Sequence, residues 1–376
     1  MTERTVPSRV RPVPAASSDP RPGVAGVEPT ELAGLLAEMG EPAFRARQVG
    51  DAVWRSEAPS WDAVTTLGLP LRAGLAERLR FDTVAETDLR LADDDATEKA
   101  LHRLPDGRLV ESVLMHYPAR GERRERNTLC ISSQAGCAVG CPFCATGELG
   151  FERDLDVAEI VDQVRHARRR LVSRGRHLTN LVFMGMGEPL LNLDAVIGAA
   201  RVLTDADRFG LGARHVTIST SGVVPGIERL TALSPQWTLA VSLHAARDAL
   251  RDLLVPLNRR WPVRAVVAAA AGYAAATGRR VSYEYVMIDG LNDTPADADA
   301  LARLLAGSGS HVNCIPMNPV AHTPERCPSS NRCETLDSAA QSRLADHQPA
   351  WPTDDCKTSI TGELDARSKT AVHRYR

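Results

Sequence analysis

Three cysteines near the middle of the chain have a spacing that suits a metal cluster. Cys137, Cys141 and Cys144 form the pattern C-x3-C-x2-C. Iron–sulfur clusters are commonly held by four cysteine thiolates. A loop with three thiolates can therefore hold a [4Fe–4S] cluster and leave one iron open to a substrate or a cofactor.

The main alternative for this loop is a structural zinc site. Such sites close with four ligands, usually as two Cys pairs or as one Cys pair and one His pair. No second pair follows the triplet at a suitable distance. The spacing itself resembles the signature of radical S-adenosylmethionine (SAM) enzymes. The resemblance implies a [4Fe–4S] cluster whose open iron takes the amino and carboxylate groups of SAM, and whose electron breaks the sulfonium bond.

Apolar segments rich in β-branched residues alternate with helical patterns in the second part of the chain. The predicted strands are 128–132, 181–186, 215–220, 239–244, 281–288 and 311–317, and the predicted helices are 157–173, 193–203, 224–233, 263–276 and 296–305. Near-continuous apolar strands joined by helices indicate a parallel sheet. We therefore predict an α/β fold with a partial (β/α)6 barrel, whose active site lies at the carboxyl ends of the strands.

Polar residues gather where these predicted strands end, on the same edge as the cysteine loop. Singly, each is more often a loop cap or a satisfied core group, but their common location favours a SAM site. Glu188 offers a carboxylate that can pair with the α-ammonium group of SAM. The serine, histidine and asparagine side chains can hydrogen-bond a carboxylate, a ribose or an adenine. The predicted SAM-binding residues are Gly187, Glu188, Ser219, Ser242, Leu243, His244 and Asn318.

Composition divides the chain into five parts. Residues 1–27 are rich in Pro, Ser, Arg and Gly, without the apolar segment of a signal peptide, and predict a disordered tail. Residues 28–82 have helical patterns, and residues 83–122 contain a hairpin around Pro105-Asp106-Gly107. Residues 123–324 form the predicted barrel. Residues 325–376 are a polar carboxy-terminal tail without a clear strand.

The net charge of −2 excludes a uniformly basic surface. RNA would have to meet local basic patches, such as the arginines at 120–126 or at 165–170, although such runs are more often solvated faces. No segment reaches the length of a membrane span. Eight cysteines in a chain without an export signal favour a cytoplasmic protein with metal-binding or catalytic thiols.

Longer motifs resemble the RlmN/Cfr family of radical SAM RNA methyltransferases, most closely the RlmN branch. The similar segments are 128–137, 150–153, 183–192, 216–222 and 241–245, and the resemblance runs from Leu32 to Pro324. Residues 44–48 are similar to the helical RNA-binding module of the RlmN branch. The resemblance implies methylation of an adenine ring, at C2 or C8, in 23S ribosomal RNA and also in transfer RNA. We expect a monomer that takes electrons from a donor such as flavodoxin or ferredoxin.

The resemblance also implies a covalent route that uses two SAM molecules. One SAM methylates a cysteine in the carboxy-terminal tail, and the other yields the radical that activates the methyl carbon. Glu111 matches the family's proton acceptor, and Cys130 lies in a matching motif, as the partner of the tail cysteine in a transient disulfide. Without the resemblance, Glu111 would be a solvated carboxylate and Cys130 a core residue.

The tail departs from the family pattern. Matching the segment 362–365 to the family's turn places Ser368 near the methyl-accepting position, and a hydroxyl cannot replace a thiolate there. Cys356 is the nearest thiol. Either Cys356 has taken over the role, or the tail has lost it, or the reading frame changes near Pro324. The alternative function is a relative that cleaves SAM but only binds RNA.

Overall fold

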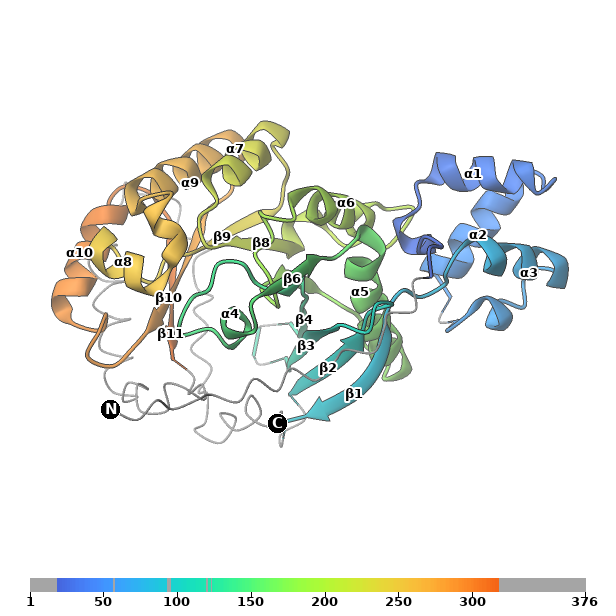
Figure 1. The fold of residues 1–376 in the computed structure, drawn as a ribbon, viewed down its shortest axis with the longest axis horizontal. Helices are drawn as coiled ribbons and strands as arrows, with labels where there is room; N and C mark the ends of the chain where they lie inside the picture. Colours follow the sequence, from blue (N-terminus) through green and yellow to red (C-terminus); the bar gives the residue numbers. More distant parts are fainter. Residues whose placement is uncertain (1–18, 57, 93–95, 120, 123, 318–376) are drawn as a thin grey trace, which may run out of the picture.

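The structure is a computed structural model that describes residues 19–56, 58–92, 96–119, 121–122 and 124–317. Its amino-terminal part is a small helical module at one end of the molecule (Figure 1). The module contains η1 (Val24–Gly26), α1 (Pro29–Glu38), α2 (Phe44–Trp54), η2 (Trp61–Ala63) and α3 (Leu69–Arg78). Trp61 anchors it, because the indole Nε1 donates to the carbonyl of Leu79 at 2.9 Å and the ring meets Phe81 edge-on at 4.9 Å.

A nine-stranded sheet forms the centre of the molecule, in the order β1-β2-β3-β4-β7-β8-β9-β10-β11. Its antiparallel part consists of β1 (Ala85–Leu91), β2 (Thr97–Arg103) and β3 (Leu109–Tyr117). The next strand, β4 (Arg126–Cys130), pairs antiparallel with β3 and parallel with β7, so it begins the parallel part. The parallel part continues with β7 (Asn180–Phe183), β8 (Val216–Thr220), β9 (Thr238–Ser242), β10 (Ser282–Met287) and β11 (His311–Pro316). The predicted hairpin is thus an extension of the same sheet.

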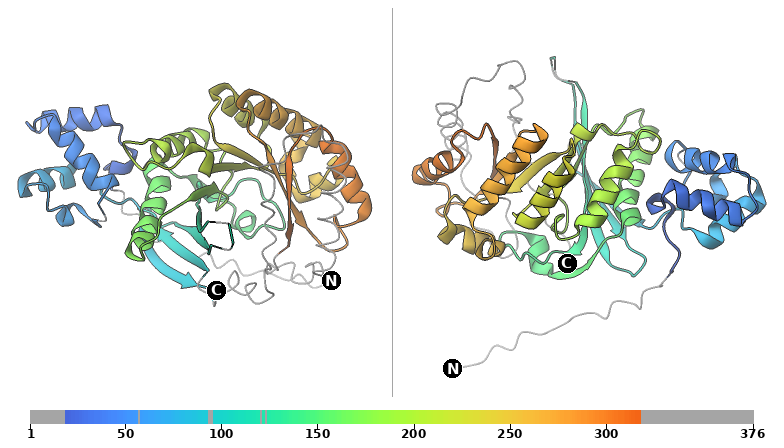
Figure 2. Two further views of the ribbon diagram at one scale, coloured as in Figure 1. Left: turned by 180° about the vertical axis from the view of Figure 1, so that it is seen from behind. Right: turned by 90° about the horizontal axis from the view of Figure 1, so that it is seen from above.

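Helices join the parallel strands and lie along the outside of the curved sheet (Figures 1 and 2). They are α5 (Val157–Ser173), α6 (Leu193–Thr204), α7 (Val224–Leu233), α8 (Asp248–Leu254), α9 (Val263–Thr277) and α10 (Pro295–Leu305), with η3 (Ala213–His215) and η4 (Pro256–Arg259) between them. Capping boxes start two of them: Asp156 with Glu159 at α5, and Thr294 with Asp297 at α10. Such reciprocal bonds satisfy backbone donors that a helix start otherwise leaves open.

The strand registers assign side chains to two faces of the sheet. Leu129, Leu181 and Ile218 belong to the face that packs against the helices, in the main apolar core. Cys130 stands opposite Val182 and opposite Val113, so these three share the other face. We call this second face the inner face. It carries the residues on which the chemistry depends.

The predicted α/β fold with a central parallel sheet is confirmed. All six predicted parallel strands are present, and β4 ends at Cys130, two residues earlier than expected. Within the described residues, strand pairing ends at β1 on one side and at β11 on the other, so the sheet is an open, partial barrel. None of the helices in these residues combines the length and apolar character needed to cross a lipid bilayer.

Candidate functional site

The cysteine loop is closed by its own small hairpin. It lies between β5 (Gln134–Gly136) and β6 (Phe151–Asp154), with the short helix α4 (Ala145–Leu149) after the third cysteine. The amide of Cys137 donates to the carbonyl of Gly150 at 2.9 Å, which closes the loop. Gly136 has φ +74°, and a Cβ there would overlap the same carbonyl oxygen. Glycine is therefore required at this position.

All three thiols of the loop are free and half-buried. Burial raises the pKa of Cys141 to about 12, and the neighbouring charges of Cys144, Cys137 and Glu188 raise it further. The pKa of Cys137 is raised for the same reasons, burial first. Because each thiolate raises the pKa of its neighbours, all three thiols ionise together only beside a compensating cation. A metal cluster supplies that positive charge, so the donor set fits a three-thiolate cluster site.

Glu188 lies beside this loop, at the carboxyl end of β7. Its buried carboxylate accepts hydrogen bonds from the Ser221 amide at 2.7 Å, the Ser221 hydroxyl at 2.8 Å and the Leu190 amide at 3.0 Å. Burial raises the pKa of Glu188, and these bonds oppose that shift. Gly187 has φ +100°, with Gln134 where a Cβ would stand. The carboxylate is thus fixed between the ends of β7 and β8.

Ser219, Ser242 and His244 come from the ends of the next two strands. Ser219 stands opposite Ala240 on the inner face, and Ser242 follows on the same face two residues later. His244 has φ +60°, and its ring meets Phe143 of the cysteine loop edge-on, with centroids 4.9 Å apart. This contact joins the end of β9 to the cysteine loop.

The protonation state of His244 follows from its surroundings. Burial lowers the pKa of His244 to about 3, with a smaller contribution from the charge of Arg251. The neutral ring accepts a hydrogen bond at Nδ1 from the Val286 amide at 3.1 Å. The proton therefore resides on Nε2, and His244 presents a hydrogen-bond donor there.

Two buried residues that the sequence did not single out hold this edge together. Arg251 donates to the carbonyls of Leu243 at 3.0 Å, Ser221 at 2.6 Å and Ser242 at 3.2 Å, and burial lowers its pKa to about 10. Asn292 donates to the carbonyl of His244 at 2.8 Å. Leu243 is fully buried and contributes its backbone. Both residues stand in ordinary polar segments, so the sequence offered no signal for them.

Glu111 lies on the inner face, two strands from β7. It stands two residues from Val113, which is opposite Cys130, so Glu111 and Cys130 share this face. The carboxylate oxygen Oε1 of Glu111 is 2.7 Å from Nζ of Lys99 on β2. Cys130 is a free thiol, and burial raises its pKa to about 12. It therefore stays protonated at neutral pH in this state.

Of the predicted site residues, two lie outside the described residues. They are Asn318 and Cys356. The structure places Cys137, Cys141, Cys144, Gly187, Glu188 and His244 at one edge of the sheet, around the cysteine loop. Ser219 and Ser242 lie on the adjoining inner face, with Glu111 and Cys130 further along it.

Comparisons with known proteins agree with this geometry. Residues 131–304 match the Radical SAM superfamily. The chain is 48% identical over 306 residues to the "Probable dual-specificity RNA methyltransferase RlmN" of Chloroflexus aurantiacus, covering 78% of this chain and 80% of that protein. A protein of the same name from Frankia alni is 50% identical over 294 residues, covering 76% of this chain and 69% of that protein. The solved structure of a radical SAM methyltransferase from Sphaerobacter thermophilus matches with a TM-score of 0.82 and 46% identity, covering 86% of this chain and 93% of that chain.

Proposed function

The chain belongs to the RlmN family of radical SAM methyltransferases, and we propose that it methylates an adenine ring, at C2 or C8, in 23S ribosomal RNA and in transfer RNA. The observation that carries the proposal is the convergence of three free thiols beside the buried carboxylate of Glu188. This arrangement fits a cluster with one open position next to a group that can receive an ammonium ion.

Each residue of the site then has a proposed role. Cys137, Cys141 and Cys144 hold the [4Fe–4S] cluster, and Glu188 pairs with the ammonium group of SAM. His244 offers its Nε2 proton to a carboxylate or a nucleoside acceptor, and Ser219, Ser242, the Leu243 backbone, the Gly187 backbone and Asn318 complete the SAM site. When bound, cluster and SAM together supply radical chemistry.

Glu111 is the proposed proton acceptor. It lies on the inner face, which faces away from the helices, and its Oε1 is engaged by Lys99. The ion pair restricts the rotamers of both side chains and so positions the carboxylate. A base must be held within hydrogen-bond reach of the proton that it removes.

The methyl route requires a thiol that alternates between methylated and disulfide states. We propose Cys356 as the methyl acceptor and Cys130 as its disulfide partner. The alternative is a relative that cleaves SAM and only binds RNA. We also propose that the protein is a cytoplasmic monomer and that a flavodoxin or a ferredoxin reduces its cluster.

One experiment separates these functions. The protein is produced anaerobically, reconstituted with iron and sulfide, and incubated with SAM, a reductant and ribosomal or transfer RNA. We expect methyladenosine in the RNA, and a tail peptide heavier by about 14 Da, the mass of one added methylene, at Cys356. Cys356→Ala should lose methylation, and Ser368→Ala should keep it. SAM cleavage without any methylated RNA would favour the alternative function.

A further inference from the structure

The two basic segments of the sequence have different structural roles. Arg165 and Arg169 of α5 both bind Asp82, at 2.9 and 2.7 Å, and Arg170 binds Glu98 at 3.1 Å. Carboxylates therefore pair with three of the four arginines at 165–170. These pairs join α5 to the sheet and to the helical module, and they leave Arg168 as the residue of this run that lines the cavity described below.

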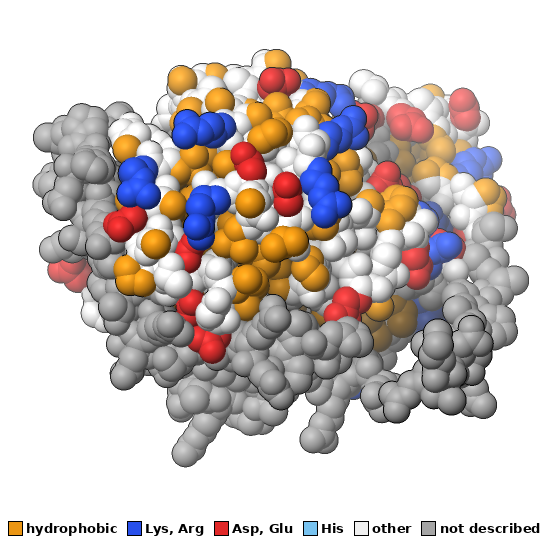
Figure 3. Space-filling view, turned by 60° about the vertical axis from the view of Figure 1, so that its left-hand side comes forward, with side chains coloured by type: hydrophobic (Ala, Val, Ile, Leu, Met, Phe, Trp, Pro, Cys, Tyr) orange, Lys and Arg blue, Asp and Glu red, His pale blue; other side chains and the backbone are white. Residues whose placement is uncertain are grey.

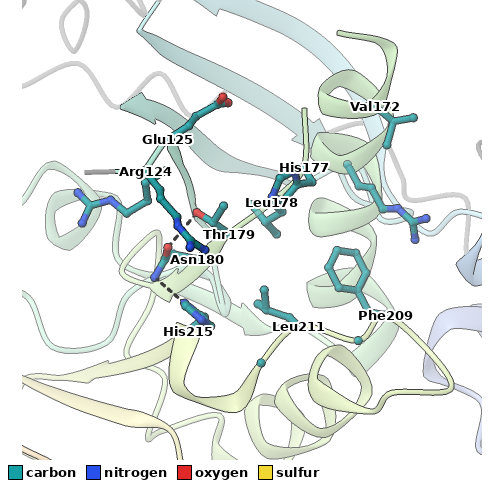
Figure 4. A pocket seen from close by; sticks show the side chains of 14 residues that line it. Arg124, Glu125, Val172, His177, Leu178, Thr179, Asn180, Phe209, Leu211 and His215 are labelled. Atoms are coloured by element: carbon teal, nitrogen blue, oxygen red, sulfur yellow. Dashed lines mark hydrogen bonds between the residues drawn. The ribbon is translucent and has the colours of Figure 1, made fainter. Parts of the chain in front are cut away.

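The other segment contributes Arg124 and Arg126 to a cavity of about 770 Å³ (Figure 4). The cavity lies at the amino ends of β4 and β7, opposite to the edge that carries the cysteine loop. Its walls come from α5 and from the segments before β7 and β8. The volume falls within the range of about 300–1,000 Å³ that is typical of small-molecule sites.

One wall of the cavity is apolar. It consists of Val172, Leu178, Phe209 and Leu211. The Phe209 ring also carries the guanidinium of Arg168, 5.5 Å from its centroid. A flat aromatic base can stack on such a wall, because stacking needs only an apolar or aromatic face.

Another part of the wall is basic. It carries Arg124 and Arg126, and the imidazoles of His177 and His215 also line the cavity. Arg126 lies 4.3 Å over the ring of Tyr117, and its Nε has no hydrogen-bond partner among the described residues. The one carboxylate of the described lining, Glu125, accepts a hydrogen bond from Asn127 at 3.0 Å. The wall therefore has an excess of positive charge, which suits a phosphate group.

The cavity adjoins the helical module. Arg168, which lines it, donates to the carbonyl of Trp54 at the end of α2. The module is the part that resembles an RNA-binding unit, so the two can contact one continuous RNA. On the face in Figure 3, by contrast, basic side chains are interspersed with acidic and apolar ones.

We propose that this cavity binds one unstacked nucleotide of the substrate RNA. Its base lies against Phe209 and Leu211, and its phosphate binds Arg124 and Arg126. The inference rests on the proposed function, because it takes RNA as the substrate. Sequence-selective RNA recognition commonly uses bases that leave the stack and lie on aromatic or guanidinium planes. The site would fix the RNA at a point distant from the target adenine.

The test measures the affinity of cluster-loaded protein for transcribed transfer RNA over a series of KCl concentrations. Arg124→Ala combined with Arg126→Ala should lower the affinity at least tenfold, and should reduce the slope of log K against log salt by about 0.7 for each lost phosphate contact. Phe209→Leu keeps the apolar volume, and should lower the affinity about tenfold without changing the slope. Arg264→Ala, on an exposed residue of α9, is the matched control.

Iron content and RNA-independent SAM cleavage are measured as checks of folding and cofactor loading. Both should stay at wild-type values in all variants. RNA affinity and salt slope that equal those of the control would overturn the proposal. Binding of free AMP that depends on Arg124 and Arg126, with unchanged RNA affinity, would also overturn it in favour of a small-molecule site. Failure of wild type to methylate RNA would instead contradict the proposed function, which this binding assay does not measure.

Discussion

At the scale of single residues, the pair formed by Lys99 and Glu111 links two strands of the inner face. Lys99 stands opposite Val113 on β3, one side-chain position along from Glu111, and the two charged groups meet diagonally at 2.7 Å. Both side chains are partly buried. If Glu111 accepts the proton, Lys99 acts through it as a positioning residue.

We predict that Lys99→Met slows RNA methylation by about 10- to 100-fold, because a displaced catalytic group loses its alignment with the reacting atom. In a Glu111→Gln background the same change should cost nothing further, since the residue through which it acts is already disabled. Single-turnover rates, with the enzyme in excess over the RNA, measure both effects. Lys99→Arg, which keeps the positive charge, is the control. If Lys99→Met slowed the Glu111→Gln variant by the same factor as it slows wild type, Lys99 would act by a route that does not involve Glu111.

The placement of the cysteines and Glu188 at one edge of the sheet was predictable from the sequence, because it depends only on spacing along a single loop or strand end. Arg251 and Asn292 were not, because each acts on backbone carbonyls that come from other strands. A charged residue such as Arg251, in a short helix, is expected at the surface. Its full burial depends on the meeting of β8 and β9, which a sequence pattern does not reveal.

At the scale of elements, the hairpin of β5 and β6 determines the shape of the cysteine loop. Gly136 and Gly140 both have positive φ, +74° and +68°. A Cβ at Gly136 would overlap the Gly150 carbonyl, whereas a Cβ at Gly140 would meet no atom within 4 Å. Alanine at position 136 would therefore meet both a steric clash and an unfavourable backbone conformation. Alanine at position 140 would meet only the unfavourable backbone conformation.

We expect Gly136→Ala to leave much less than a full complement of iron bound after reconstitution, because the added methyl forces the hairpin apart and displaces Cys137. Gly140→Ala should keep the cluster, at a cost in stability of about 1–2 kcal/mol for an alanine in left-handed backbone. Iron and sulfide analysis measures the first effect and thermal unfolding the second. Equal iron content in the two variants would contradict this account of the loop.

Some element boundaries could be predicted closely, and the reasons are local. The helices at 157–173 and 224–233 match the structure to the residue, and α5 has a complete capping box at its start. Strand β1 was not predicted, because it is largely exposed and its residues Ala85–Leu91 include only three apolar side chains. It forms through pairing with β2, which is a tertiary interaction.

At the scale of the whole molecule, buried neutral histidines make stability depend on pH. His102 is fully buried between the sheet and α5, with its Nε2 2.8 Å from the Ser112 hydroxyl. Burial lowers the pKa of His102 to about 3, with smaller effects from His166 and Arg170. Between that value and the usual unfolded pKa of about 6.5, only the unfolded chain takes up the proton. Falling pH therefore favours unfolding.

We predict that wild type loses about 2 kcal/mol more stability than His102→Gln between pH 7 and pH 5, because the glutamine does not titrate. The glutamine amide can still donate to Ser112. Urea denaturation of both proteins at the two pH values measures the difference. His177→Gln, at an exposed position, is the control. If wild type and His102→Gln have the same dependence on pH, His102 is not the residue responsible.

The charged outer strand of the sheet has a further consequence for the behaviour of the protein at high concentration. β1 carries Glu86, Asp88 and Arg90, and its pairing with β2 shifts register between Glu86 and Asp88. Alternating charges and a bulge discourage another strand from adding to a sheet edge. This edge therefore resists intermolecular strand addition, the first step towards amyloid-like aggregation. Exchanging Asp88 and Arg90 for valine would remove that protection, and it would also change the inner face, because these two residues stand opposite Leu101 and Lys99.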